Sequence, residues 1–136
     1  MKTTTWTDLK TLTLPSRPAA GAWTLVLDLV PANTQLRITC SGTWTYTEGF
    51  TSGPDGDPMS AMKGLLVASA PAGCVVGRFG GSTAGLAGDM AGFAVGSSCV
   101  PAPPAASVPL YLTINVNPTA LISTKGTMTV TISEAS

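Results

Sequence analysis

The chain has 136 residues, 44% of them hydrophobic and only 10% charged, and seven basic residues balance seven acidic ones. This composition excludes a disordered chain, which needs low hydrophobicity and high net charge, and it fits one domain with its own core. The basic residues are scattered, which argues against nucleic acid as a partner because phosphate binding needs clustered cations. Little charge also means little repulsion between copies, which favours a homo-oligomer or another assembly over a monomer kept soluble by Thr and Ser.

The first 22 residues are either an N-terminal arm or the first edge strand of a domain formed by residues 23–136. Alternating Thr and Leu at 11–14 suit a strand added to the edge of a sheet, its own or a neighbour's. Exposed apolar side chains in a free tail would promote aggregation, so we expect them to be packed. The candidate assembly contacts are Trp6, Leu9, Leu12 and Leu14. Residues 1–6 lack the apolar stretch of a signal peptide, so we expect cytoplasmic synthesis.

Apolar residues recur at every second position in five later segments, which is typical of strands with one buried face. In residues 23–30 the expected apolar face is Trp23, Leu25, Leu27 and Leu29. The same alternation runs through residues 35–40, 43–47, 110–116 and 127–132, with Thr frequent on the outer face. Trp44 and Tyr46 share one face, so both should point into the core.

Two shorter apolar runs, residues 64–68 and 74–79, predict central strands. Gly, Pro, Asn and Asp separate the runs, and no segment has a convincing helical pattern. Short strands with turns between them predict an all-β fold, an antiparallel sandwich, with no apolar run of the roughly 18 residues that span a membrane.

The chemistry of the side chains argues against an enzyme. Histidine is absent, which removes the commonest general base. Ser60 and Lys63 have the spacing of a serine–lysine pair, but that pattern needs a helix, and here it follows a proline. Asp55 and Asp57 lie too close in one turn to flank a glycosidic bond. They could bind Ca²⁺ or accept hydrogen bonds from sugar hydroxyls, although turn formation alone explains both residues.

Three cysteines, Cys40, Cys74 and Cys99, are an odd number with wide spacing. Buried free thiols and a disulfide between Cys74 and Cys99 both remain open. Without histidine, three cysteines do not predict a zinc site, and no cofactor is expected.

Several short motifs occur in a fixed order between about Val30 and Ile132. They are Gly42, Trp44 and Tyr46 on a strand, the loop 53–57, the pair Gly64 and Leu65, the strand end Arg78, Phe79 and Gly80, and an apolar strand at 110–114 followed by Asn115, Pro118 and Gly126. Their order and spacing resemble the soluble, calcium-dependent, galactose-binding lectins of pseudomonads. The resemblance implies a small jelly-roll β-sandwich.

The ligand-binding residues of that family are mostly not retained. Of the residues that hold its calcium, only the tyrosine, Tyr46, has a counterpart. Its aspartate, threonine and two asparagines are matched by Val116, Ala120, Ser123 and Thr124, and its sugar-reading stretch is matched by residues 60–63. Val and Ala offer no side-chain oxygen to a hard dication, so we expect the fold without the calcium site.

Two functions follow as hypotheses. The first is a structural or adhesion module of a larger assembly, such as a phage virion with this protein as capsid decoration or tail component. The alternative is a lectin that binds glycans without calcium. The candidate ligand-binding residues are Tyr46, Asp55, Asp57, Asn115, Asn117, Ser123 and Thr124.

Overall fold

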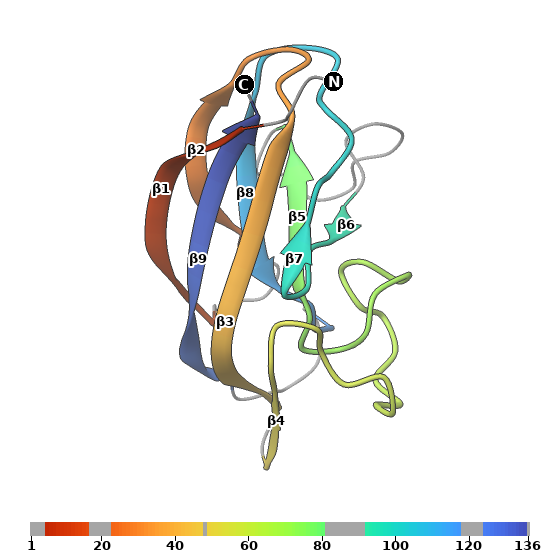
Figure 1. The fold of residues 1–136 in the computed structure, drawn as a ribbon. Coiled ribbons are helices and arrows are strands. Elements are labelled where there is room, and N and C mark those ends of the chain that lie inside the picture. The colour runs from red at the N-terminus through yellow and green to blue at the C-terminus, as the bar shows by residue number, and fades with distance from the viewer. Residues whose placement is uncertain (1–4, 17–22, 48, 81–91, 118–123, 136) are drawn as a thin grey trace.

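The computed structural model describes residues 5–16, 23–47, 49–80, 92–117 and 124–135, which form two antiparallel sheets packed face to face (Figure 1). The first sheet contains β1 (Trp6–Pro15), β9 (Lys125–Ala135), β3 (Leu36–Thr47) and β4 (Phe50–Ser52) in that order, with β7 (Ser98–Cys99) against β3. The second contains β2 (Thr24–Val30), β8 (Val108–Ile114), β5 (Val75–Phe79) and β6 (Phe93–Ala94). The predicted all-β antiparallel sandwich is confirmed. No helix in the described ranges is long and apolar enough to cross a membrane.

The core lies between the two sheets and is built by alternate residues of the long strands. On β3, β9 and β8 these side chains are almost fully buried, as the two-residue period predicts. They are Leu36, Ile38, Cys40, Met128, Val130, Ile132, Leu110, Leu112 and Ile114. Trp44 and Tyr46 continue the inner face of β3 and are each 2% exposed, so their predicted burial is confirmed.

The strand β2 buries mainly the face opposite to the expected one, although Leu27 of the expected face packs partly against the core. Val26 and Val30 are buried, whereas Leu25 and Leu29 are 45% and 59% exposed. Both faces of this segment carry branched apolar residues, so the period alone does not decide which face packs. The pairing of β2 with β8 is interrupted on both sides of Leu27, and these irregularities set the side that faces the core.

Residues 64–68 do not form the predicted central strand. They lie in an irregular segment whose Val67 and Ala70 join Cys74, Val76 and the partly buried Trp23 in a second, smaller apolar cluster. The other predicted central strand is confirmed as β5, which is buried along its whole length between β8 and β6.

The N-terminal segment forms β1 and pairs with β9 of the same chain, from Trp6 opposite Ala135 to Pro15 opposite Thr127. Leu14 is fully buried in the core of its own domain and Leu12 packs partly against it. Leu14 therefore cannot contact a neighbouring subunit, and its assignment as an assembly contact is wrong.

The other two assembly candidates are more accessible. Leu9 is 44% exposed, while the ring of Trp6 lies 4.8 Å from the guanidinium carbon of Arg37 in a cation–π contact.

Candidate functional site

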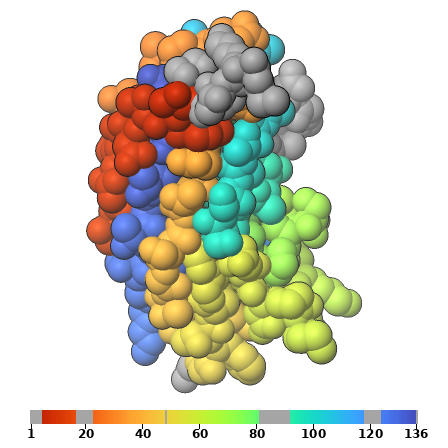
Figure 2. Space-filling view, viewed as in Figure 1, coloured from red at the N-terminus to blue at the C-terminus, as the bar shows by residue number. Residues whose placement is uncertain are grey.

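One end of the sandwich is formed by β4 and the loop that follows it, the region coloured yellow to green at the lower end of the molecule in Figure 2. This loop begins with a turn at residues 53–57, which is closed by a hydrogen bond of 3.1 Å from the Gly56 N–H to the Gly53 carbonyl. The Asp57 N–H then donates a bond of 2.8 Å to the Ala72 carbonyl. Gly56 has a positive φ of 78°, and a Cβ there would lie 2.7 Å from the Cys74 nitrogen. A glycine is therefore required where the turn docks against the segment leading into β5.

Tyr46 and Asp57 meet at this end of the sandwich. The Tyr46 hydroxyl donates a hydrogen bond of 2.5 Å to one Asp57 oxygen, and the Met59 N–H donates one of 3.0 Å to the other. These bonds lower the pKa of Asp57, while burial and then the Asp57 carboxylate raise the pKa of Tyr46. Asp57 is half-exposed, and a carboxylate has about four acceptor positions, so it can still accept hydrogen bonds from a ligand.

Asp55 has different surroundings from Asp57. Its carboxylate is exposed and accepts a 2.8 Å hydrogen bond from the Ser97 N–H, which ties the turn to the segment before β7. The two carboxylates thus serve separate contacts: Asp57 accepts from the N–H two residues further on, the local capping that its turn context suggested, whereas Asp55 bonds a segment 42 positions away.

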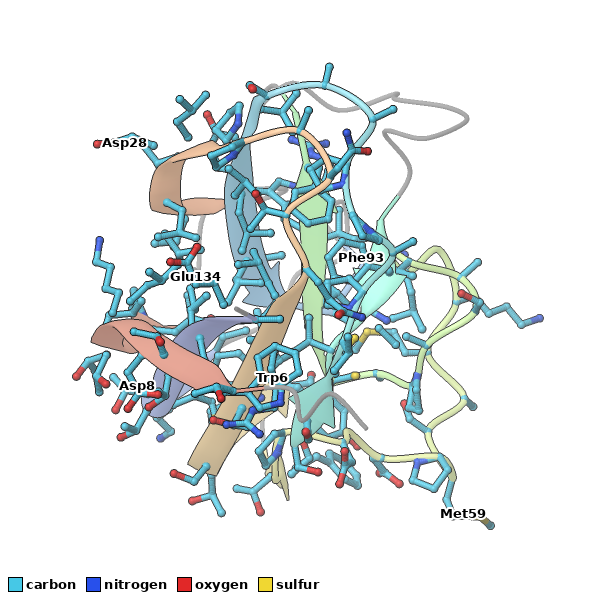
Figure 3. The ribbon with its side chains drawn as sticks, turned by 45° about the horizontal axis from the view of Figure 1, so that its top comes forward. Trp6, Asp8, Asp28, Met59, Phe93 and Glu134 are labelled. Atoms are coloured by element: carbon cyan, nitrogen blue, oxygen red, sulfur yellow. The ribbon has the colours of Figure 1, made fainter. Side chains whose placement is uncertain are left out.

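Two exposed apolar side chains lie near the Tyr46–Asp57 pair, and neither was among the residues predicted for a site. The ring of Phe50 on β4 is 57% exposed, with its centroid 6.2 Å from that of Tyr46. Met59, whose N–H binds Asp57, is 87% exposed and points away from both sheets (Figure 3). Phe50 falls outside every alternating segment, so its only signal was an aromatic residue beside a predicted turn.

Asn115 is not available to a ligand, so its assignment as a ligand-binding residue is wrong. Its side chain is fully buried, accepts a hydrogen bond from the Val67 N–H, 2.9 Å, and donates to the carbonyls of Val67, Ala70 and Pro71 at 3.0 to 3.1 Å. Asn115 therefore fixes the irregular segment onto the second sheet. Asn117 acts on the same segment, since its side-chain nitrogen donates to the Lys63 carbonyl, 2.8 Å.

The remaining candidates give little support to a metal site. Ser123 and Ala120 lie outside the described residues. Thr124 has a buried hydroxyl for which the described part of the chain provides no hydrogen-bond partner. At the position of the family's calcium-binding aspartate, Val116 is 5% exposed and packs in the core. An apolar core side chain cannot supply the carboxylate that calcium needs, so these residues do not fit the ion.

The described side chains also lack the arrangement of an activated nucleophile. The Ser60 hydroxyl accepts a hydrogen bond from the Met62 N–H, and Lys63 is exposed on a stretch that is not helical. All three cysteines are free thiols, so Cys74 and Cys99 are not paired. Burial, with smaller contributions from the neighbouring Cys74, Asp55 and Cys99, raises the pKa of Cys40 to about 12, which leaves almost no thiolate at neutral pH.

Neither a protein-family model nor a curated protein matches the chain. Among solved structures, it is similar to the N-terminal domain of EclA, described as a PllA-like lectin, with a TM-score of 0.65 and 17% sequence identity. The match covers 93% of this chain and 97% of that domain. The sandwich described above therefore has the fold of a PllA-like lectin domain.

Proposed function

We propose that the protein is a non-catalytic carbohydrate-binding module that works without calcium. Its binding surface is formed by Phe50, Met59 and Asp57, and the hydroxyl of the buried Tyr46 holds the Asp57 carboxylate in place. The observation that carries the proposal is an exposed aromatic ring beside a tyrosine whose hydroxyl orients a half-exposed carboxylate. An aromatic ring can pack on the C–H face of a sugar, and a carboxylate accepts hydrogen bonds from its hydroxyls.

Three further observations support the proposal. The fold is similar to that of a lectin domain. Val116 occupies the position of a calcium ligand with a core side chain, which favours recognition without the metal. The Ser60 hydroxyl accepts a hydrogen bond from the Met62 N–H, and burial raises the pKa of the Cys40 thiol, so among the described residues neither group is an activated nucleophile, which favours binding over catalysis.

A glycan array probed in the presence of a chelator tests this function. We expect saturable binding to a defined set of glycans, weakened about tenfold or more by Phe50→Ala or Asp57→Asn. Leu29→Ala is the matched control, because Leu29 is equally exposed but lies on β2, and it should bind like the parent. Thermal melts confirm that each variant is folded. Binding that needs calcium, or that survives both substitutions, would contradict the proposed surface.

A second candidate is a structural role in a larger particle, such as decoration or tail of a phage virion, after synthesis in the cytoplasm. The observation that favours it is that Leu9, Leu25 and Leu29 are exposed on β1 and β2, the edge strands of the two sheets. These edges are neighbours, since the Lys10 side chain donates to the Val26 carbonyl, 3.1 Å. Exposed edges with apolar side chains are surfaces on which another subunit can dock.

Light scattering after gel filtration tests the structural role. The parent should form an oligomer that Leu25→Ser together with Leu29→Ser dissociates into folded monomers. A parent protein that stays monomeric at high micromolar concentration would speak against self-assembly.

A further inference from the structure

A cavity of about 540 Å³ lies beneath the proline-rich segment that joins β7 to β8. Phe79, Phe93, Cys99 and Val108 line it together with every residue from 101 to 106. In Figure 1 this segment runs from β7 toward the end of the sandwich opposite β4, so the cavity is separate from the proposed carbohydrate surface. Its volume falls within the roughly 300–1,000 Å³ range of small-molecule sites.

The wall formed by residues 101–106 is held in place at both ends. At one end, Cys99 pairs with Ile38 of β3. At the other, the Pro104 carbonyl accepts a hydrogen bond from the Asn33 N–H, 2.8 Å, and the Ser107 hydroxyl accepts one from the Ala32 N–H, 3.2 Å. Between the anchors, three prolines restrict the backbone, so the wall resists collapse and the cavity is formed before any ligand enters.

The floor of the cavity is aromatic. Phe79 of β5 is buried, and its ring centroid lies 5.5 Å from that of Phe93 on β6, with the planes tilted by 35°. This pair presents apolar ring surface opposite the prolines and alanines of the wall. A flat or ring-shaped molecule would contact both sides at once.

The described residues that line the cavity carry no charged side chain, and their one polar side-chain group is the thiol of Cys99. A charged ligand would lose its hydration there without gaining an opposite charge. From this chemistry we propose that the cavity binds an uncharged, predominantly apolar small molecule containing a ring. This would be a second binding site, independent of the carbohydrate surface.

The test uses the uncharged fluorescent probe N-phenyl-1-naphthylamine on the full chain. We expect saturable binding of one probe per chain with a blue-shifted emission. Cys99→Leu adds a larger side chain to the cavity wall and should weaken binding about tenfold or more. The matched control is Val100→Ser, because Val100 is the adjacent residue, is 47% exposed and does not line the cavity. Phe50→Ala, which disrupts the carbohydrate surface, should also leave probe binding unchanged.

A second measurement on the unmodified protein avoids any effect of substitution on folding. Cys99 is half-buried, whereas Cys40 and Cys74 are buried, so a small alkylating reagent should modify Cys99 first. Saturating probe should slow that modification about tenfold, as followed by peptide mass spectrometry. Unsaturable probe binding, equal binding by Cys99→Leu, or unchanged alkylation of Cys99 would each overturn the proposal, whatever the glycan experiment shows.

Discussion

Replacing Asn115 by alanine should destabilise the whole domain, although the residue directly follows β8 and its side chain resembles an ordinary polar loop residue in the sequence. The amide of Asn115 bonds the backbone of the irregular segment at Val67, Ala70 and Pro71. In the Asn115→Ala variant these backbone groups lose their partner inside a buried site where water does not easily replace it.

The size of the effect follows from the bonds lost. The amide has two hydrogens and accepts one bond, so about three hydrogen bonds of about 1 kcal/mol each disappear, which predicts a loss of about 3 kcal/mol. For a domain of this length, that corresponds to a fall in melting temperature of about 10 °C. Asn117→Ala is the matched control, because the bond from its side chain to the Lys63 carbonyl lies in an exposed setting, and we expect a smaller loss of about 1 kcal/mol.

Urea denaturation followed by tryptophan fluorescence measures both variants, with the slope of the transition checked for two-state behaviour. A loss in Asn115→Ala no larger than that in Asn117→Ala would refute the view that Asn115 is a structural residue. It would return Asn115 to the set of candidate ligand-binding residues.

Four further predictions concern the core, the first strand, the metal and pH. Trp44→Ala should cost about 3–5 kcal/mol in the same denaturation assay, because the ring is buried and its N–H donates to a backbone carbonyl; a variant as stable as the parent would show the ring to be exposed. Leu14→Ala should cost about 2–5 kcal/mol and Leu9→Ala less than about 0.5 kcal/mol, and the reverse order would place β1 outside its own domain. Calcium or chelator should leave the melting temperature unchanged, and a chelator-induced fall of several degrees would disprove this. Tyr46→Phe should reduce stability most between about pH 5 and 9. The lowered pKa of Asp57 gives stability that is lost as pH falls through that pKa. The raised pKa of Tyr46 gives stability that is lost as pH rises through its own. In urea titrations, the stability advantage of the parent over the variant should therefore shrink toward both low and high pH.

The sequence was sufficient to predict strands where one face is apolar and the other is rich in threonine. On β3 and β9 only one orientation buries the apolar residues, so the alternation determines the face. On β2 the valines and leucines occupy both faces. Which face packs in the core depends on the irregular pairing with β8, and the alternation within β2 holds no information about that pairing. Residues 64–68 are apolar enough for a strand, but the Val67 N–H and carbonyl bond the Asn115 side chain, 48 positions away, in place of a neighbouring strand.

The candidate site was also predictable only in part, because its contacts join segments that are distant in sequence. Tyr46 was expected in the core and Asp57 in a turn, yet their contact depends on how the turn docks beside β5. Asn115 was placed near a ligand because the resemblance puts it beside the former calcium loop. Its burial became evident only with the segment that packs over it. Contacts between loops that are distant in sequence therefore account for most of the differences between the predicted and the observed surroundings of these residues.

The pairing of Trp6 with Ala135 places the first and last described strands side by side, and this determines where a linker or tag would be joined to the domain. Leu36, at the start of β3, pairs with Glu134 beside these residues, and ten residues of extended strand separate it from Tyr46, about 30 Å. Trp6 and Ala135, the described residues nearest the two ends of the sequence, therefore lie at the end of the sandwich remote from Phe50 (Figure 1). A linker, an affinity tag or a solid support joined to either terminus would hold the domain with the Phe50 loop surface directed outward. A detection tag beside Trp6 or Ala135 is therefore suitable for probing the glycan array, because it lies away from the proposed binding surface.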